Sequence, residues 1–346
     1  VIPPYHPGKR VANAIKLASN ENPLGCSPEV PGAVLAALKE AEVYPDSRGA
    51  ALVKAIAEHL GQGELEQNII LGNGSDEIIG MAASAYIEPG SNAIIARPTF
   101  SQYAYAVRLF GGDIQFIDLD EGRHNLKAMA AAVNQKTRIV FLCNPNNPTG
   151  TYFSQTELLA FLASIPSRVL VVLDEAYCEF ATAKDYPQSI PLLDQYPNLL
   201  ILRTFSKLHG LAALRLGYGL ASPEIIELFL RIKQPFNVNS LAMAAGQAAI
   251  KDRNFQQRTL EMNRQGMAYL TDQLDQLGYD YYPSQSNFIC IHTDHSADEI
   301  YQHMLGYGIT IRSLRSFGME QAIRVTVGPQ KALEAFITGL KELKHA

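Results

Sequence analysis

Short apolar runs that alternate with amphipathic stretches dominate the first two thirds of the chain. Seven such runs cover residues 69–71, 93–96, 114–117, 139–143, 169–173, 199–202 and 218–221. Each run is largely apolar at successive positions and is followed by turn-forming residues, which is typical of strands buried under helices on both faces. The pattern predicts an α/β fold with an open, mainly parallel sheet flanked by helices. Ligands of such sheets bind at the carboxyl ends of the strands.

The pattern changes beyond about residue 235. A long helical stretch at 255–277 precedes short alternating strands at 279–282, 288–292, 309–312 and 323–327, with helices at 297–305 and 331–343. This predicts a smaller α+β domain. The first 25 residues are rich in proline, asparagine and glycine, which predicts an irregular arm. We therefore expect an arm at residues 1–25, a large domain at 26–235 and a small domain at 236–346.

Composition narrows the range of functions. A chain of 346 residues suits a large domain with a smaller partner, and a formal net charge of −5 gives nucleic-acid binding no electrostatic support. No apolar run approaches the roughly 18 residues of a membrane span, and we expect no signal peptide. The four cysteines are scattered without a CxxC motif, which favours reduced thiols and a cytoplasmic location. His292 and His295 form an HxxH pair, but no further ligand completes a metal motif.

Lys207 is the first candidate for chemistry, because it follows the predicted strand at 199–202 and enters a glycine-containing turn. Thr204 and Ser206 shortly precede it, and Arg215 follows eight residues later. Most lysines are solvated surface charges. A lysine partly removed from water, however, becomes a nucleophile suited to a Schiff base, and hydroxyls with an arginine can bind an anion. A lysine beside a phosphate cup is what pyridoxal phosphate requires.

Other strand ends carry further candidates. Residues 72–77, which include Gly74, Ser75 and Asp76, open a helix whose first amides can bind phosphate. Glu77 stands where the nicotinamide-cofactor fingerprint requires its third glycine, so a dehydrogenase is disfavoured. Phe100, after the next strand, either packs in the core or stacks on a planar ring.

Amides and a carboxylate follow the two most apolar strands. The turn at residues 144–150, with Asn147 at its centre, combines two prolines, three asparagines and a glycine, which predicts a rigid turn with amide donors. Asp174 leaves the strand at 169–173, and a carboxylate there must be paired unless it only caps the next segment. Tyr177 adds a phenol. In the small domain, Arg312 and Arg324 are either surface charges or binders of carboxylate or phosphate.

Taken together, these motifs resemble the fold-type I pyridoxal-phosphate aminotransferases, and most closely their histidinol-phosphate aminotransferase branch. The resemblance runs nearly end to end and rests on residues 19–23, 44–46, 72–77, 144–150, 174–177, 206–215 and 324–328. It implies that Lys207 forms the Schiff base and that Asp174 pairs with the pyridine nitrogen. Asn147 and Tyr177 would hold the phenolic oxygen of the ring, and Phe100 would stack on it.

The same resemblance assigns the phosphate and the substrate. The cofactor phosphate would be held by Thr204, Ser206, Arg215 and the backbone around Gly74, Ser75 and Asp76. Tyr44 is similar to a tyrosine that reaches the neighbouring subunit's phosphate, which implies a homodimer with shared active sites. Arg324 resembles the arginine that binds the donor's α-carboxylate. Arg312, Tyr5 and Asn22 match positions in the substrate pocket, where the substrate phosphate binds in this branch.

The implied activity is ping-pong transamination with Lys207 as general base. For this branch, histidinol phosphate and 2-oxoglutarate would give imidazole acetol phosphate and glutamate. An aromatic amino-acid aminotransferase and a threonine-phosphate decarboxylase, whose motifs are similar, are the alternatives. A non-catalytic sensor with an aminotransferase-like domain is disfavoured, because only an irregular arm precedes the domain and the net charge is negative.

Overall fold

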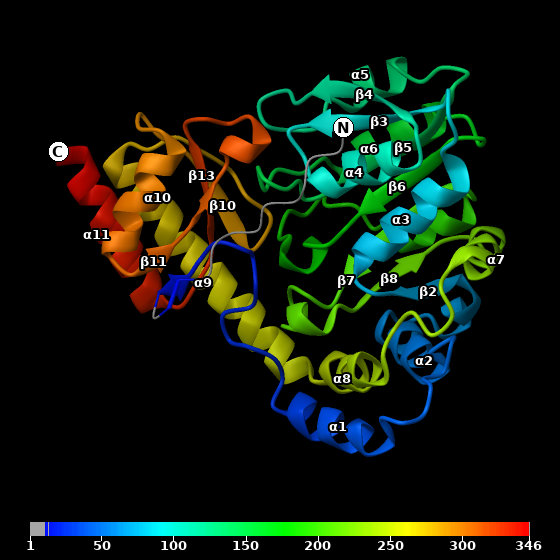
Figure 1. Ribbon diagram of the computed structural model, residues 1–346. Helices are drawn as coiled ribbons and strands as arrows, with labels where there is room; N and C mark the ends of the chain where they lie inside the picture. The colour runs from blue at the N-terminus through cyan, green and yellow to red at the C-terminus, as the bar shows by residue number, and fades with distance from the viewer. Residues whose placement is uncertain (1–10, 13, 346) are drawn as a thin grey trace.

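A computed structural model describes residues 11–12 and 14–345 of the chain. Seven strands form one large sheet in the order β2-β8-β7-β6-β5-β3-β4 (Figure 1). They are β2 (Ile69–Gly72), β3 (Asn92–Arg97), β4 (Asp113–Asp118), β5 (Thr137–Cys143), β6 (Leu170–Asp174), β7 (Leu199–Thr204) and β8 (Gly217–Leu220). All pairings are parallel except those of β8, which runs antiparallel to β7 and β2. The predicted mainly parallel sheet is confirmed, and each of the seven predicted runs overlaps one of its strands.

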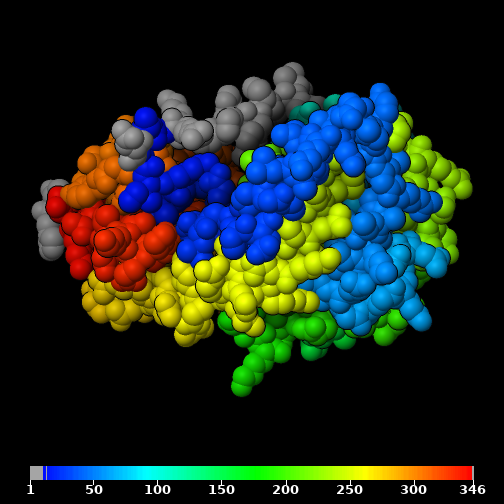
Figure 2. Space-filling model, turned by 90° about the horizontal axis from the view of Figure 1, so that it is seen from below, coloured from blue at the N-terminus to red at the C-terminus, as the bar shows by residue number. Residues whose placement is uncertain are grey.

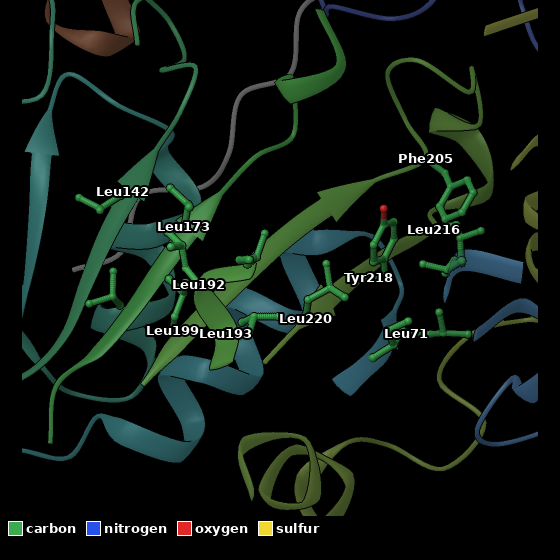
Figure 3. Packing of buried hydrophobic residues seen from close by; sticks show 14 of the residues in the cluster. Leu71, Leu142, Leu173, Leu192, Leu193, Leu199, Phe205, Leu216, Tyr218 and Leu220 are labelled. Carbon is green, nitrogen blue, oxygen red and sulfur yellow. The ribbon is translucent and has the colours of Figure 1, made fainter. Parts of the chain in front are cut away.

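Both faces of this sheet are covered by helices, because successive strand residues are apolar. On one face pack α3 (Ser75–Tyr86), α4 (Ser101–Leu109) and α7 (Pro223–Ile232), with strand residues such as Phe141 and Val172. On the other pack α2 (Ala50–His59), α5 (Leu126–Ala131), α6 (Gln155–Ser164) and α8 (Ser240–Lys251), with neighbours such as Leu142 and Leu173. Figure 3 shows leucine side chains of this second core packed on that face of the sheet. Each fully buried side chain of this kind stabilises the fold by about 1.5–3 kcal/mol.

The small domain contains a four-stranded antiparallel sheet in the order β12-β13-β10-β9. Its strands are β9 (Tyr281–Tyr282), β10 (Phe288–His292), β12 (Arg312–Ser313) and β13 (Ala322–Thr326), and its helices are α9 (Arg253–Leu277), α10 (Ala297–Gly306) and α11 (Gln330–His345). The strand predicted at 309–312 is divided, because β11 (Ile309–Thr310) pairs instead with β1 (Ile15–Lys16) of the arm. The arm is therefore not wholly irregular, since residues 15–16 add a strand beside the small domain.

The connection between the two domains runs through α8 and α9. Helix α8 packs against α1 (Glu29–Ala37) and α2, and Figure 2 shows blue residues from the first part of the chain beside yellow residues on the surface. Ala242, Ala245 and Ile250 of α8 belong to the core of the large domain. Helix α9 then leads from α8 to the small domain (Figure 1). The domain boundary at 235 stays a proposal, and this packing favours placing it nearer the start of α9.

Short 3₁₀ turns connect several of these elements. They are η1 (Leu38–Glu40), η2 (Gly63–Asn68), η3 (Cys178–Phe180), η4 (Ile190–Asp194), η5 (Ala212–Leu214) and η6 (Arg315–Phe317). Within residues 11–12 and 14–345, no helix combines the length and apolarity needed to cross a membrane.

The register of the large sheet positions the site. Cys143 pairs with Asp174, and Asp174 pairs with Leu202, so β5, β6 and β7 end at one edge of the sheet.

Candidate active site

A cavity of about 570 Å³ lies at the carboxyl ends of these strands, between the large sheet and the small domain. It brings together predicted residues that are far apart in the sequence. Those lining it are Ser75, Asp76, Phe100, Asn147, Asp174, Tyr177, Thr204, Ser206, Lys207, Arg215, Arg312 and Arg324. The parallel strands explain this convergence, since each delivers its following loop to the same edge.

Lys207 stands in the turn after β7, partly buried. Its Nζ donates a hydrogen bond to the carbonyl oxygen of Ser19 at 3.3 Å and lies 5.5 Å from the centre of the Tyr177 ring. Burial, and next the positive charge of Arg324, lower the pKa of Lys207 to about 8. At pH 7 roughly a tenth of such amines are neutral, about 300-fold more than for an unperturbed lysine. The amine is therefore poised both to add to a carbonyl and to accept a proton.

Asp174 ends β6 and is only 3% exposed. Its Oδ2 accepts a hydrogen bond from the phenol of Tyr103 at 2.7 Å, and its Oδ1 accepts one from the Ala176 amide at 3.1 Å. Burial raises the pKa of Asp174 to about 6. The buried carboxylate that the sequence predicts is thus paired with a phenol and an amide, and it remains mainly ionised above neutral pH.

The start of α3 and Arg215 form one wall of the cavity. Gly74 has φ +79°, and a Cβ there would lie 2.6 Å from Nη2 of Arg215. A Cβ on Gly217 would lie 2.4 Å from the backbone nitrogen of Ser75. The two glycines therefore permit the guanidinium and the helix amides to approach one anion. Arg215, itself at φ 55°, donates to Asp76 Oδ2 at 3.1 Å.

Two buried hydroxyls complete this wall. Thr204 and Ser206 both line the cavity, and the Ser206 amide donates to the Thr204 hydroxyl at 3.1 Å. Burial raises the pKa of Asp76, whereas Arg215 and Lys207 lower it. Hydroxyls, a guanidinium and the amides of a helix N-terminus are the donor set that suits a phosphate dianion.

Arg324 lies on β13 and is 6% exposed. Its guanidinium donates to the side-chain oxygen of Asn147 and, at 3.0 Å, to the carbonyl oxygen of Ala18. It also lies 5.2 Å from the centre of the Phe288 ring. Arg312 stands directly opposite Arg324 in the β12–β13 pairing, so both side chains leave the same face of the small sheet.

The turn at residues 144–150 is buried throughout. Asn146 holds it from within, because its amide nitrogen donates to Thr149 Oγ1 at 2.9 Å and its oxygen accepts from Thr99 at 2.7 Å. Asn144 exchanges hydrogen bonds with the backbone of Phe153. The predicted rigid turn is confirmed, and it fixes Asn147 at the cavity.

Among the described residues, three that the sequence predicts for the site do not line the cavity of this chain: Asn22, Tyr44 and Gly74. Asn22 donates to the Leu208 carbonyl at 2.8 Å and to Thr259 at 3.1 Å, so it ties the arm to the loop after Lys207. Tyr44 is 79% exposed and stacks on Phe236. Gly74 contributes through its backbone, and Tyr5 lies outside the described residues.

Two residues that hydrogen-bond to predicted site residues were not singled out from the sequence. Tyr103, which bonds Asp174, lies one helical turn after Phe100, and that spacing was the available signal. Asn20, at φ 56°, donates to the phenol oxygen of Tyr177 at 3.0 Å. Burial raises the pKa of this phenol. In the arm, therefore, Asn20 and not Asn22 contacts a residue of the cavity.

Comparison with known proteins agrees with this geometry. The family "Aminotransferase class I and II" matches residues 12–340. The chain belongs to this family. A histidinol-phosphate aminotransferase of Geobacillus sp. (strain WCH70) is 46% identical to this aminotransferase over 351 residues, covering 99% of this chain and 96% of the relative. One of Geobacillus thermodenitrificans (strain NG80-2) is 44% identical over 339 residues, covering 95% and 92%.

Solved structures extend the similarity to the whole fold. The histidinol-phosphate aminotransferase from Sinorhizobium meliloti in complex with pyridoxal-5′-phosphate has a TM-score of 0.89 at 28% identity, covering 96% of this chain and 91% of that chain. The predicted fold-type I aminotransferase, its transferase activity and its pyridoxal-phosphate cofactor are thereby confirmed.

The residues of this aminotransferase fit the cofactor. The wall of Thr204, Ser206, Arg215 and the α3 amides suits its phosphate, and the missing Cβ of Gly74 lets the Arg215 guanidinium approach the start of α3. A neutral fraction of Lys207 suits attachment, and the Asp174 carboxylate suits a protonated ring nitrogen. When bound, the cofactor supplies an electrophilic carbonyl carbon and a ring that withdraws electrons from the substrate Cα.

Proposed function

We propose that this aminotransferase interconverts histidinol phosphate plus 2-oxoglutarate and imidazole acetol phosphate plus glutamate by a ping-pong mechanism. The observation that carries the proposal is the opposed pair Arg312 and Arg324 at the cavity. Guanidinium groups bind phosphate and carboxylate with the same planar fork of donors, so one site can accept a phosphate ester and a dicarboxylate in turn. The names of the full-length relatives support the choice of phosphate ester.

Within this proposal, Lys207 is the base that takes the proton from the substrate Cα and later gives this proton back. Its pKa of about 8 suits this exchange near neutral pH, because neither protonation state is strongly disfavoured. When the cofactor is bound, Asp174 would keep the ring nitrogen protonated, Asn147 and Tyr177 would hold the ring oxygen, and Phe100 would stack on the ring.

Arg324 binds the α-carboxylate of the amino donor. Its buried position between Asn147 and the Phe288 ring fixes the guanidinium, so little rotamer freedom is lost when the substrate binds. Arg312 is more exposed and donates to Ser316 at 3.3 Å, which suits a more adaptable contact with the distal anion. Glutamate and the phosphate ester share the inner arginine and differ at the outer one.

We further propose a homodimer in which Tyr44 reaches the partner subunit's cofactor phosphate. Tyr44 stacks on Phe236 with ring centres 4.7 Å apart, and three large apolar residues that precede it in the chain are exposed: Leu35, Leu38 and Val43. Phe236 adopts φ 55°, which is costly for a bulky residue and marks a constrained position. Asn237 donates a hydrogen bond to Glu77 of α3 at 2.7 Å. Glu77 follows Ser75 and Asp76 at the start of α3, which belongs to the phosphate wall formed by Thr204, Ser206, Arg215 and the α3 amides. A second copy of the chain would cover this apolar surface.

Aromatic amino acids are the second candidate substrates, because Tyr105 and Phe317 also line the cavity.

The proposed location is the cytoplasm. The four cysteines are free thiols, which supports this location.

Steady-state kinetics of the purified holoenzyme test the proposed substrate. With 2-oxoglutarate as acceptor, kcat/KM should be highest for histidinol phosphate, lower for phenylalanine and negligible for threonine phosphate. Arg312→Gln should reduce kcat/KM for histidinol phosphate by about 10- to 100-fold, the loss expected for a charge-assisted contact, with a smaller effect on phenylalanine. Fast phenylalanine turnover without histidinol phosphate turnover would contradict the proposal.

A further inference from the structure

Tyr103 is a fully buried tyrosine whose only polar atom meets Asp174. Its ring stacks on Phe141 at 4.9 Å between centres and an interplanar angle of 13°. Phe100 meets the same ring edge-on, with centres 5.5 Å apart at 82°. The Tyr103 phenol therefore has a fixed position, and its oxygen lies 2.7 Å from Asp174 Oδ2.

We propose that Tyr103 is a positioning residue that keeps the Asp174 carboxylate ionised and aimed into the cavity. The inference rests on the proposed role of Asp174 toward the ring nitrogen. Because Phe100 packs on the Tyr103 ring, one side chain braces both the carboxylate and the aromatic residue assigned to the cofactor ring.

The surroundings of Asp174 make this hydrogen bond important. Burial is the largest influence on the pKa of Asp174 and raises it, and the nearby carboxylates Asp76 and Glu175 raise it further. The Tyr103 phenol is the largest influence that lowers it, ahead of the Ala176 amide. Cys143 on β5 is also close, but burial raises the pKa of its thiol to about 12, so it stays neutral.

The proton of this hydrogen bond belongs to Tyr103. Burial, and next the charge of Asp174, raise the pKa of the Tyr103 phenol well above its ordinary value. The phenol therefore remains a donor over the whole working pH range. Such a donor stabilises the charged carboxylate more strongly than its protonated form, because a hydrogen bond to a charged acceptor is the stronger one.

Titration of the apoprotein tests the inference directly. The Asp174 carboxyl is followed by ¹³C NMR in the wild type and in Tyr103→Phe, which removes one oxygen and keeps the stacked ring. We expect Asp174 to bind its proton on the order of 10- to 100-fold more tightly in the variant, as loss of a charge-assisted hydrogen bond predicts. Tyr281→Phe is the matched control, because it removes another phenol–carboxylate hydrogen bond, to Asp275 at 2.9 Å, outside the cavity. It should leave the Asp174 titration unchanged.

Equilibrium dialysis of pyridoxal phosphate gives a second readout. Tyr103→Phe should weaken cofactor binding about tenfold, and more below pH 7 than at pH 8.5, but should have no further effect in an Asp174→Asn background. An unchanged Asp174 titration in a natively folded Tyr103→Phe would overturn the inference. Unchanged cofactor affinity in Asp174→Asn would instead overturn the proposed role of Asp174.

A packing variant covers the case in which Tyr103→Phe does not fold. Phe141→Leu keeps the phenol but loosens the ring that aims it, so the pKa of Asp174 should rise by a smaller amount. A titration identical to that of the wild type would then overturn the inference.

Discussion

A buried ion pair ties together the two strands that carry Asp174 and lead to Lys207. Arg203 donates through Nη2 and Nε to one oxygen of Glu175, at 2.8 and 3.1 Å. The side chain of Glu175 is 0% exposed and that of Arg203 is 16% exposed. Removing one partner leaves the other charge in a dry site, whereas removing both leaves neither charge of the pair there. The account therefore predicts strong non-additivity.

Arg203→Met should destabilise the apoprotein by about 3–5 kcal/mol, the cost of an unpaired buried charge. For a chain of 346 residues this corresponds to a melting temperature lower by roughly 4–7 °C. Glu175→Leu should cost less, about 1–3 kcal/mol, because Arg203 still faces Glu179. The double variant should lose less stability than the sum of the single variants and should recover part of the Arg203→Met loss, because Glu175 is no longer left unpaired although Glu179 still lacks the guanidinium. Chemical denaturation of the cofactor-free proteins measures this, since bound cofactor would add its own stabilisation.

The Arg203→Met deficit should also depend on pH. Burial raises the pKa of Glu179, and Arg203 lowers it. Without the guanidinium, the folded-state pKa of Glu179 rises further above its unfolded value, so the unfolded chain releases the proton first. The deficit should therefore grow as pH rises through the folded pKa of Glu179 in the wild type, and it should level off once pH exceeds the higher folded pKa in the variant. Additive single variants, or a deficit that shrinks with rising pH, would refute the reasoning.

Two further variants test the phosphate wall and the proposed interface. Gly74→Ala should weaken cofactor binding at least tenfold, because the added Cβ would lie 2.6 Å from Arg215 Nη2 at a φ of +79°. The control is Gly80→Ala within α3, which meets open space and should bind the cofactor normally. Equal cofactor affinities of the two variants in dialysis would contradict the role of Gly74. Phe236→Ala should remove the ring on which Tyr44 stacks and should speed cofactor loss from the dimer several-fold, as Tyr44→Phe should. A cofactor release rate equal to that of the wild type would contradict the proposed role of Tyr44 toward the partner subunit's cofactor phosphate.

The sequence predicted the large sheet well because its signals are local. Consecutive apolar residues with a turn at the end determine both a buried strand and the position of its following loop. For that reason the sequence alone predicts that Lys207, Asp174 and Asn147 lie at one edge of the sheet. The phosphate wall is predicted in the same way, since Gly74 follows β2 and Arg215 lies in the connection between β7 and β8.

What the sequence could not provide depends on register and on contacts distant along the chain. The opposition of Arg312 and Arg324 arises from strand pairing, which the spacing of the two residues does not determine. The partner of Asp174 is 71 residues away, and Asn20 meets Tyr177 across 157 residues. The division of the predicted strand at 309–312 likewise depends on β1 pairing with one half only.

Covalent trapping at Lys207 tests the central claim most directly. Holoenzyme reduced with borohydride should carry the cofactor on the peptide that contains Lys207, as mass spectrometry would show, and Lys207→Ala should carry none and should lose transamination. Lys233→Ala is the matched control, because Lys233 is also a lysine whose pKa is lowered by burial but it does not line the cavity. It should label fully at Lys207. Labelling of Lys207→Ala at another residue with activity retained would contradict the account.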